Sequence, residues 1–412
     1  MRALMISPAM PAMTGGGLSM RMGLFLHSLI TIADTDLLVL PLGGLSNLNA
    51  KLDKRFVANC KIIPLIGQED TQFKFISRIK DPVQKLEAFR NYGRSALTAS
   101  LSVPVMAEIS ATTADITYDL IHVGRSYLAD AGLVVQGHAR RTLDADENDA
   151  EVSRRQAALA FSKGEQNWAD MNWAEADACD RQQNQTLGKF DLVFASSMKE
   201  AESLQTYRKG QPISVMPNSA LPPQSVLRQD DGNTLLFVGS LGHWPNTEGL
   251  QWFVHEVWPL VVASSRKQPH FLIVGRDCPA EIRELSSVPG VSVHPDVENL
   301  DEFYAHASLA VVPLRAGGGT RIKIIEAALH GLPVVSTSLG AEGLPFANGR
   351  EIWLADDAPS MAASIVSALG NPHLARVVGQ RAQVLASSEF DFDRISRKLA
   401  CQWTELLAKR IP

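Results

Sequence analysis

The segment AGGGTRIKIIEAALHGLPVVST, residues 316–337, places three glycines directly before a short helix-compatible run and a second apolar stretch after it. Because the apolar run Leu309–Leu314 precedes this segment, we expect a strand followed by a loop at Gly317–Gly319. Thr320 is the expected N-cap of a helix that runs to His330, where a glycine and a proline follow. A strand, a tight glycine loop and a helix in this order are typical of α/β folds.

The predicted loop leads into a helix start, where free backbone N–H groups and the helix dipole attract anions. Arg321 and Lys323 add positive charge to a first turn in which acidic residues are normally favoured by about 0.3–1 kcal/mol. We therefore expect an anionic ligand such as a diphosphate. Glu326 lies three residues beyond Lys323 and can accept hydrogen bonds from the vicinal hydroxyls of a ribose, which indicates a nucleotide. The alternative is a tight turn in which Arg321 and Lys323 are solvated and Glu326 pairs with Lys323.

Apolar runs alternate with helix-compatible segments on both sides of a stretch rich in turn residues, 219–233. This pattern predicts an α/β protein with two Rossmann-like, doubly wound domains, at residues 1–218 and 234–390, joined by that linker. An amphipathic helix is expected at 391–412, and the sequence leaves open whether it packs on the N-terminal domain or on its own. The expected strands are 2–7, 36–42, 60–65, 119–124, 191–197 and 213–218, and then 235–240, 270–275, 291–295, 309–314, 333–337 and 351–356.

Composition narrows the class of protein. Hydrophobic residues make up 45% and charged residues 20% of the 412 residues, as in an ordinary globular enzyme. Lys and Arg number 39 against 44 Asp and Glu, a formal charge of −5, so we expect no nucleic-acid partner. The four cysteines lie far apart, and no apolar run approaches the roughly 18 residues of a membrane span. We therefore expect a soluble cytoplasmic protein without a removed signal.

Residues 73–94 form a basic segment. They carry six cations against two acids, with aromatic and aliphatic residues between them. This composition is compatible with a seat for a lipid-linked or anionic acceptor, or with peripheral membrane contact. The favoured interpretation is a solvated helical hairpin that is broken at Pro82.

Several longer segments resemble one enzyme family. Residues 235–357, which include LLFVGSLGHWPNTEGLQWFVHEVWP, FLIVGRD and the glycine-loop segment, resemble the C-terminal domain of GT-B glycosyltransferases of the retaining family-4 type (glycosyl transferases group 1). The N-terminal half resembles this family more loosely, through MISPAMPAMTGGGLSMR, YDLIHVG, RRTLDADENDAE, FDLVFASSMKE and VMPNSA. The resemblance implies two Rossmann-like domains facing across a cleft. It also implies transfer, with retention, of a hexosyl or related sugar from a nucleotide-diphosphate sugar to a hydroxyl of a carbohydrate, polysaccharide precursor, lipid-linked or other acceptor.

The resemblance assigns roles to residues of the second domain. Lys323 and Arg321 are expected to hold the diphosphate and Glu326 the ribose. The remaining expected donor contacts are Gly239 and Ser240 near the phosphates, the main chain at Val297 near the base, and Arg276. Since cations and the helix dipole already neutralise a diphosphate, we expect neither a metal nor another cofactor.

The sequence departs from the family pattern at two places. Gly318 stands where the family's E-x7-E signature has its first Glu, and Ser240 replaces a familiar Arg. We expect Arg321 and main-chain donors of the loop to take over part of the donor grip. The loop residues are Gly317, Gly318, Gly319 and Thr320.

The first domain offers three weaker candidates. The glycine loop after the first strand matches the place where the family brings its backbone close to the donor phosphate; it comprises Gly15, Gly16 and Gly17. His122 lies near a histidine position of the family, although a lone His is more often structural. Asp144-Ala145-Asp146 resembles the metal-binding D-x-D of another glycosyltransferase fold, although most acidic runs are solvated surfaces. We expect no metal there, and Asp146 remains a candidate for an acceptor contact or a general base.

Three other functions are compatible with parts of the sequence. A sugar-nucleotide epimerase or phosphorylase on the same two-domain plan needs extra catalytic groups that the sequence does not indicate. A nicotinamide-dependent dehydrogenase is disfavoured because the first loop lacks G-x-G-x-x-G. A catalytically inactive nucleotide-sugar-binding protein is compatible with Gly318 in place of the family Glu. The sequence predicts neither the sugar, the base, the acceptor nor the oligomeric state.

Overall fold

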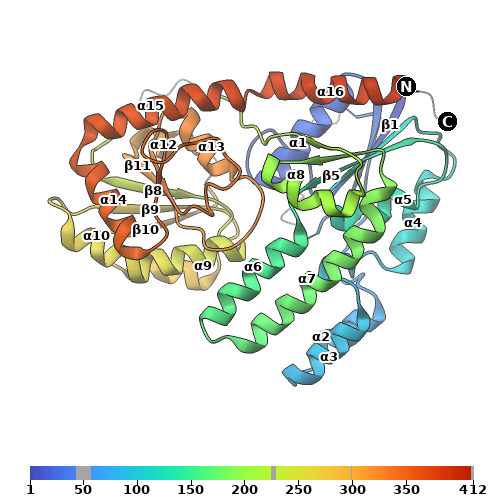
Figure 1. Ribbon diagram of the computed structural model, residues 1–412, viewed down its shortest axis with the longest axis horizontal. Coiled ribbons are helices and arrows are strands. Elements are labelled where there is room, and N and C mark those ends of the chain that lie inside the picture. The colour runs from blue at the N-terminus through green and yellow to red at the C-terminus, as the bar shows by residue number, and fades with distance from the viewer. Residues whose placement is uncertain (43–56, 224–228, 298, 410–412) are drawn as a thin grey trace. The chain divides into compact units, whose positions relative to one another are not determined.

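The computed structural model describes residues 1–42, 57–223, 229–297 and 299–409. The chain divides into two compact units, residues 1–218 with 393–412 and residues 219–392, each containing its own parallel sheet (Figure 1). The prediction of two Rossmann-like α/β domains is confirmed. None of the helices in the described ranges is long and apolar enough to cross a membrane.

The first unit contains a parallel sheet whose described strands follow the order β3-β2-β1-β4-β5-β6-β7. Its strands are β1 (Arg2–Ser7), β2 (Asp34–Val39), β3 (Asn59–Ile62), β4 (Leu120–Gly124), β5 (Arg140–Asp146), β6 (Leu192–Ala195) and β7 (Ile213–Val215). Its helices are α1 (Gly17–Ile30), α2 (Thr71–Arg78), α3 (Pro82–Tyr92), α4 (Val103–Thr113), α5 (Ala129–Leu133), α6 (Asp149–Ser162), α7 (Gln166–Thr186), α8 (Met198–Leu204) and α16 (Phe392–Ala408). The interior strand β5 is not among the strands that the sequence predicts.

The second unit contains a parallel sheet in the order β10-β9-β8-β11-β12-β13. Its strands are β8 (Thr234–Val238), β9 (His270–Gly275), β10 (Val291–Pro295), β11 (Leu309–Val312), β12 (Val334–Ser336) and β13 (Trp353–Leu354). Its helices are α9 (Trp244–Trp252), α10 (Trp258–Ser264), α11 (Ala280–Arg283), α12 (Asp301–His306), α13 (Ile322–Leu329), α14 (Ala358–Gly370) and α15 (Pro372–Glu389). Each strand falls within or close to an apolar run that the sequence predicts as a strand. The helices lie in the segments between or after these runs.

Strand order reverses direction at one place in each sheet, between β1 and β4 in the first unit and between β8 and β11 in the second. In doubly wound sheets, ligands bind outside the carboxyl ends of the strands at such a switch point. In the second unit, the loops that begin there are the one after β8 and the glycine loop after β11. The topology therefore directs attention to these two loops.

Helix α16 belongs to the first unit although it lies at the far end of the sequence (Figure 1). Its Ile395, Leu399 and Trp403, spaced four residues apart, are buried. The indole Nε1 of Trp403 donates to Thr142 Oγ1 on β5, 3.2 Å away. The hydroxyls of Ser28 on α1 and Ser396 are hydrogen-bonded at 2.9 Å. An apolar stripe at helical spacing thus fixes this helix against α1 and the sheet.

Candidate functional site

Lys323, on the first turn of α13, lies against the main chain that follows β8. A Cβ atom added to Gly239 would lie 2.8 Å from Lys323 Nζ and 3.1 Å from Asn246 Nδ2. A side chain at position 239 would therefore displace the ammonium group. Because Gly239 has no side chain, the ammonium group lies directly beside the backbone at the switch point, as expected for a phosphate site.

The Lys323 ammonium has polar and aromatic neighbours. Its Nζ donates to Asn246 Oδ1 at 2.7 Å and lies 4.1 Å from the centre of the Phe237 ring. Within the described ranges, no carboxylate forms an ion pair with it, so the expected alternative of a Lys323–Glu326 pair is wrong. Burial, and then the charge of Arg321, lower the pKa of Lys323 to about 7. The site thus holds a cation whose charge an anionic ligand would stabilise.

Glu326 lies one turn further along α13 and contacts a tyrosine. Tyr304 donates its hydroxyl to Glu326 Oε2 at 3.5 Å, and its ring stacks on His330 at 4.3 Å. Burial raises the pKa of Glu326 to about 7. A partly buried carboxyl group with one weak side-chain donor can accept further hydrogen bonds from ligand hydroxyls. The sequence analysis did not identify Tyr304, since nothing local to it indicates a contact with position 326.

The glycine loop before α13 has the backbone that glycine permits. Gly317 and Gly319 have φ of 104° and 67°, values that residues other than glycine rarely adopt. The Arg321 guanidinium folds back, and its Nη1 donates to the Gly319 carbonyl at 2.9 Å. The N-cap of α13 is Arg321 and the helix begins at Ile322, so the prediction of Thr320 as N-cap is wrong by one residue. Arg321 in this position shapes the loop as well as adding charge.

Of the other expected donor contacts, the structure brings Ser240 to the Lys323 site and does not bring Arg276 or Val297 into contact with Lys323. The Ser240 carbonyl accepts from Asn246 Nδ2 at 2.7 Å, so Ser240 lies in the same group as Gly239 and Lys323. Arg276 follows β9 with an exposed side chain, and its carbonyl accepts from Leu241 N at 2.7 Å. Val297 follows β10 and is partly buried. Neither Arg276 nor Val297 is among the described contacts of Lys323, and their roles stay predictions.

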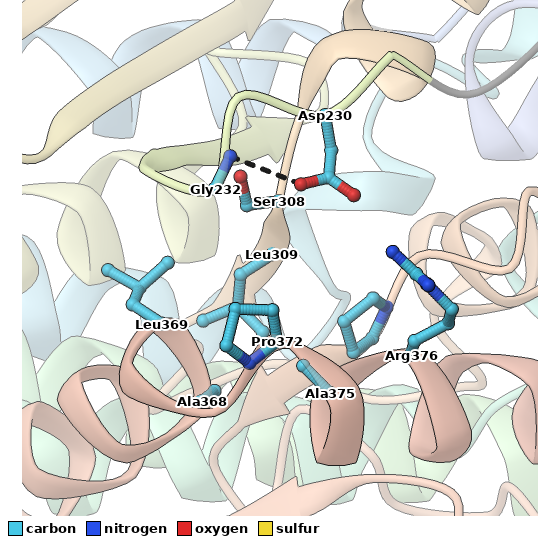
Figure 2. Close-up of a pocket in the computed structure, with 10 residues that line it drawn as sticks. Asp230, Gly232, Ser308, Leu309, Ala368, Leu369, Pro372, Ala375 and Arg376 are labelled. Atoms are coloured by element: carbon cyan, nitrogen blue, oxygen red, sulfur yellow. Dashed lines mark hydrogen bonds between the residues drawn. The ribbon is translucent and has the colours of Figure 1, made fainter.

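A small cavity of this unit lies at the opposite end of the sheet, where the parallel strands begin. It has a volume of about 20 Å³ and is lined by Asp230 and Gly232 before β8, Ser308 before β11 and Pro333 before β12 (Figure 2). The Gly232 amide donates to Asp230 Oδ1 at 3.1 Å. Space of this size suits a single water molecule, so the carboxyl edge remains the candidate for a nucleotide.

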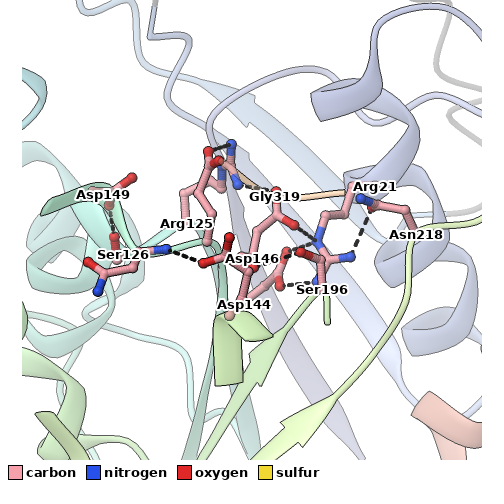
Figure 3. Close-up of polar contacts among 12 residues, drawn as sticks. Arg21, Arg125, Ser126, Asp144, Asp146, Asp149, Ser196, Asn218 and Gly319 are labelled. Atoms are coloured by element: carbon pink, nitrogen blue, oxygen red, sulfur yellow. Dashed lines mark hydrogen bonds and ion pairs between the residues drawn. The ribbon is translucent and has the colours of Figure 1, made fainter. Parts of the chain in front are cut away.

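The first unit contains a buried polar network that the sequence analysis missed. Arg21 on α1 is almost fully buried and makes a bidentate ion pair with Asp144 on β5, at 2.6 and 2.7 Å. Its Nη1 also donates to the Met216 carbonyl at 3.1 Å and to Asn218 Oδ1 at 2.9 Å (Figure 3). Asp144 is therefore neither solvated nor arranged as half of a metal site, and the D-x-D interpretation is wrong for it. The one sequence signal for the buried position of Arg21 is its partner, Asp144, because a buried carboxylate requires a cation.

Asp146 ends β5 between two arginines. Its carboxylate pairs with Arg21 at 3.3 Å and with Arg125, whose guanidinium also pairs with Glu147 at 2.9 Å (Figure 3). Asp146 and Arg125 have φ of 62° and 75° although neither is glycine. Strained residues of this kind persist where the surroundings hold them firmly, often at functional sites. A carboxylate held by two guanidinium groups is a weak proton acceptor, which argues against Asp146 as a general base.

His122 is a core residue. Its ring stacks on Phe25 at 4.7 Å, lies edge-on to Trp403 at 5.3 Å and is fully buried. Its Nδ1 is hydrogen-bonded to Thr142 Oγ1 at 2.9 Å. Burial, and then the charge of Arg21, lower its pKa to about 3. The catalytic prediction for His122 is wrong, because a neutral ring enclosed by aromatic side chains cannot reach a substrate.

The loop after β1 leads into α1 through the three expected glycines. Gly15 has a φ of 107°, Gly16 is the N-cap of α1 and Gly17 is its first residue. The loop packs on the helix, since a Cβ atom at Gly23 would collide with the main chain of Ala12. The structure thus places these glycines at the switch point of the first sheet, and their contact with a ligand stays a prediction.

The two parallel-sheet α/β units match the fold of GT-B glycosyltransferases. Over 99% of both chains, the structure is similar to sucrose-phosphate synthase from Thermosynechococcus elongatus, with a TM-score of 0.68 and 18% identity. It is also similar to TarM from S. aureus in complex with UDP (TM-score 0.66, 12% identity, 99% of this chain and 100% of that one). Anabaena HepE in complex with UDP and glucose gives a TM-score of 0.62 at 14% identity, over 98% of this chain and 100% of that one. At these identities the likeness concerns the fold.

The match to a sequence family is confined to the second unit. Residues 232–371 match the family model described as Glycosyl transferases group 1. A 44.6 kDa uncharacterized protein in the cps region of Klebsiella pneumoniae is 28% identical over 143 residues, which are 32% of this chain and 36% of that one. The chain thus aligns with about a third of the length of this relative. The matched segment contains Gly239, Lys323 and Glu326, and together with the fold it supports a glycosyltransferase.

Proposed function

We propose that the protein transfers a hexosyl or related sugar from a nucleotide-diphosphate sugar to an acceptor hydroxyl. The observation that carries this proposal is the position of Lys323 Nζ at the switch point of the second sheet, beside the backbone of Gly239. This cation follows a glycine loop and lies inside the segment that matches the glycosyltransferase family model. A diphosphate is the ligand that such a combination suits best.

In this proposal, the diphosphate contacts Lys323 and main-chain N–H groups of the loop 317–320, while Glu326 accepts hydrogen bonds from the ribose. Negative charge grows on the diphosphate as the bond to the sugar breaks. Donors that are already in place stabilise that charge, and loss of one such donor costs about 3 kcal/mol in comparable sites. Gly318 in place of the family Glu leaves room for main-chain contacts here.

We further propose that transfer proceeds with retention and without a metal. The leaving phosphate can itself take the proton of the acceptor hydroxyl. This suits a first unit in which His122 is enclosed in the core and Asp146 is held by Arg21 and Arg125. Activity is then expected to persist in EDTA, because Lys323 and the helix start supply the positive charge.

The acceptor that we propose is a carbohydrate or a lipid-linked saccharide in the cytoplasm. TarM was solved with fondaparinux and α-GlcNAc-glycerol besides UDP, and HepE with UDP-glucose, so UDP-sugars and saccharide acceptors are the first probes to try. An epimerase, a phosphorylase and an inactive binding protein remain the alternatives, and they differ from a transferase in their products.

The test is incubation with radiolabelled UDP-sugars, with and without a panel of saccharide acceptors. We expect labelled acceptor from the wild type and a loss of about 100-fold in rate for Lys323→Ala, the equivalent of about 3 kcal/mol. Glu326→Ala should mainly raise the KM for the donor. Matched controls are the exposed Lys267→Ala and Glu281→Ala of the same unit. Equal rates in Lys323→Ala and Lys267→Ala would refute the assignment, and an epimerised donor without transfer would favour the alternative.

A further inference from the structure

The carboxamide of Asn246 lies between Lys323 and the loop that follows β8. Asn246 belongs to the first turn of α9 and is only 6% exposed. Its Nδ2 donates to the Ser240 carbonyl at 2.7 Å, and its Oδ1 accepts from Lys323 Nζ at 2.7 Å. One side chain thus joins the loop after β8 to the first turn of α13, the helix that follows β11, across the switch point of the second sheet.

The two partners of Asn246 need opposite hydrogen-bonding groups. The Ser240 carbonyl can only accept a hydrogen bond, and the Lys323 ammonium can only donate one. A side chain that contacts both must therefore present a donor to one and an acceptor to the other, as a carboxamide does. The isosteric carboxylate of aspartate has no donor when it is ionised, and alanine has neither group. Replacement by either residue therefore breaks this connection in a defined way.

The helix that carries Asn246 is fixed on both sides of the switch point. On the side of β8, Thr247 Oγ1 donates to the Leu241 carbonyl at 2.7 Å. On the side of β11, α9 packs closely on the main chain, since a Cβ atom at Gly249 would collide with the Pro313 carbonyl oxygen. Asn246 therefore projects from a rigid element rather than from a loop, which favours a precise position of its amide.

Asn246 orients the Lys323 ammonium without cancelling its charge. A lysine side chain is long and flexible, and contacts with Asn246 and with the Phe237 ring, whose centre lies 4.1 Å from Nζ, restrict it. Both neighbours are neutral. The charged groups that face Lys323 are Arg321, which disfavours its positive charge, and Glu326, which favours it without an ion pair in the described part of the chain. A cation that is oriented in advance can bind an anion without reorganisation.

We propose that Asn246 is a positioning residue for the donor diphosphate. It holds Lys323 Nζ beside the main chain of Gly239 and acts on the ligand through that ammonium group. Gly239 is part of the arrangement, because a Cβ atom there would lie 3.1 Å from Asn246 Nδ2 as well as 2.8 Å from Lys323 Nζ. This inference rests on the proposed function, since it assumes that a nucleotide-diphosphate sugar binds at Lys323.

The experiment compares wild type, Asn246→Asp and Asn246→Ala in calorimetric titrations with UDP-glucose between pH 6 and pH 9. Asn246→Asp should bind about tenfold more weakly at pH 7, because its carboxylate forms an ion pair with Lys323 that competes with the diphosphate. The carboxylate also keeps Lys323 protonated to higher pH, so the loss of affinity on the alkaline side should move up by about one pH unit. Asn246→Ala should weaken binding about tenfold without that upward move.

The matched control is Asn348→Asp, which adds the same charge at an exposed position of the same unit. Its carboxylate keeps the acceptor that Asn348 Oδ1 offers to the Leu354 amide. This variant should bind UDP-glucose like the wild type at every pH.

A second measurement needs no nucleotide. In NMR titrations of protein with isotopically labelled lysine, with the Lys323 signal assigned by Lys323→Arg, that signal should titrate about one pH unit higher in Asn246→Asp than in the wild type. UDP-glucose binding that both Asn246 variants leave unchanged would overturn the inference, as would a Lys323 titration that Asn246→Asp does not move. If the wild type does not bind UDP-glucose, the proposed function fails and this inference fails with it.

Discussion

At the scale of single residues, the candidate nucleotide site combines two groups whose burial moves their pKa values toward neutrality. Burial lowers the pKa of Lys323 to about 7 and raises the pKa of Glu326 to about 7. Perturbed groups that meet at a sheet switch point are typical of functional sites. Neither group has an oppositely charged partner within ion-pair distance in the described part of the chain. Each group favours the charged form of the other through space, and a ligand that supplies closer partners would offset the remaining cost of burial.

This pair predicts a pH optimum for donor binding. Above pH 7 Lys323 loses its proton and its attraction for the diphosphate, and below pH 7 Glu326 gains a proton and accepts ribose hydroxyls less well. Affinity for UDP-glucose, whose diphosphate keeps its charge over this range, should therefore peak near pH 7 in calorimetric titrations. Glu326→Gln should keep the fall on the alkaline side and lose the one on the acidic side. An affinity that rises steadily from pH 6 to pH 9 would contradict this account.

The same residues show what sequence could reveal about the site. Lys323, Glu326 and the glycine loop were predictable because their spacing places charges and bare backbone at a helix start. Asn246, Phe237 and Tyr304, which surround the two charged groups, come from other elements and carry no local signal. Their involvement follows from the tertiary fold, as does the burial that shifts both pKa values. Among the first-unit candidates, His122 is enclosed in the core, and a ligand contact of the loop Gly15–Gly17 stays a prediction.

At the scale of elements, β5 shows how a buried strand can escape a hydrophobicity pattern. Four of the seven residues in its sequence RRTLDAD are charged, yet the strand lies between β4 and β6. Asp144 is tolerated there because Arg21 on α1 supplies a bidentate partner. The pair ties the first helix to the centre of the sheet, and Asn218 and the Met216 carbonyl complete the arginine's contacts.

Breaking this pair should be costly. Arg21→Met leaves Asp144 buried without its main partner and should lower the free energy of unfolding by about 3–5 kcal/mol. The double variant Arg21→Met with Asp144→Leu should recover much of that loss, because it removes the uncompensated charge as well. Urea unfolding followed by fluorescence gives both values. If the single and double variants were equally destabilised, the ion pair would not be what holds α1 to β5.

At the scale of the whole molecule, the chain builds two units of similar design, and its last helix returns to the first. The sequence predicted every strand of the second sheet, because each is a short apolar run between turn residues. It left the placement of α16 open, because an amphipathic stripe predicts that one side of a helix is buried but does not identify the residues that it packs against. The partners are Phe25, Phe194 and Thr142, which no pattern in residues 391–412 could identify.

Removal of the largest of these contacts should therefore affect the first unit. Trp403 is fully buried among aromatic rings, and Trp403→Ala should cost about 3–5 kcal/mol of stability. UDP-glucose binding by the second unit should remain within twofold of wild type at a temperature where the variant is folded. Calorimetric unfolding and titration measure the two effects. A variant with wild-type stability would mean that α16 contributes little to the core.

The most direct test of the central claim is a crystal structure of the protein with UDP bound. The account predicts that diphosphate oxygens lie within hydrogen-bonding distance of Lys323 Nζ and of the main chain of the glycine loop 317–319. It also predicts that the ribose hydroxyls contact the Glu326 carboxylate. UDP bound elsewhere, with Lys323 still donating only to Asn246, would contradict it.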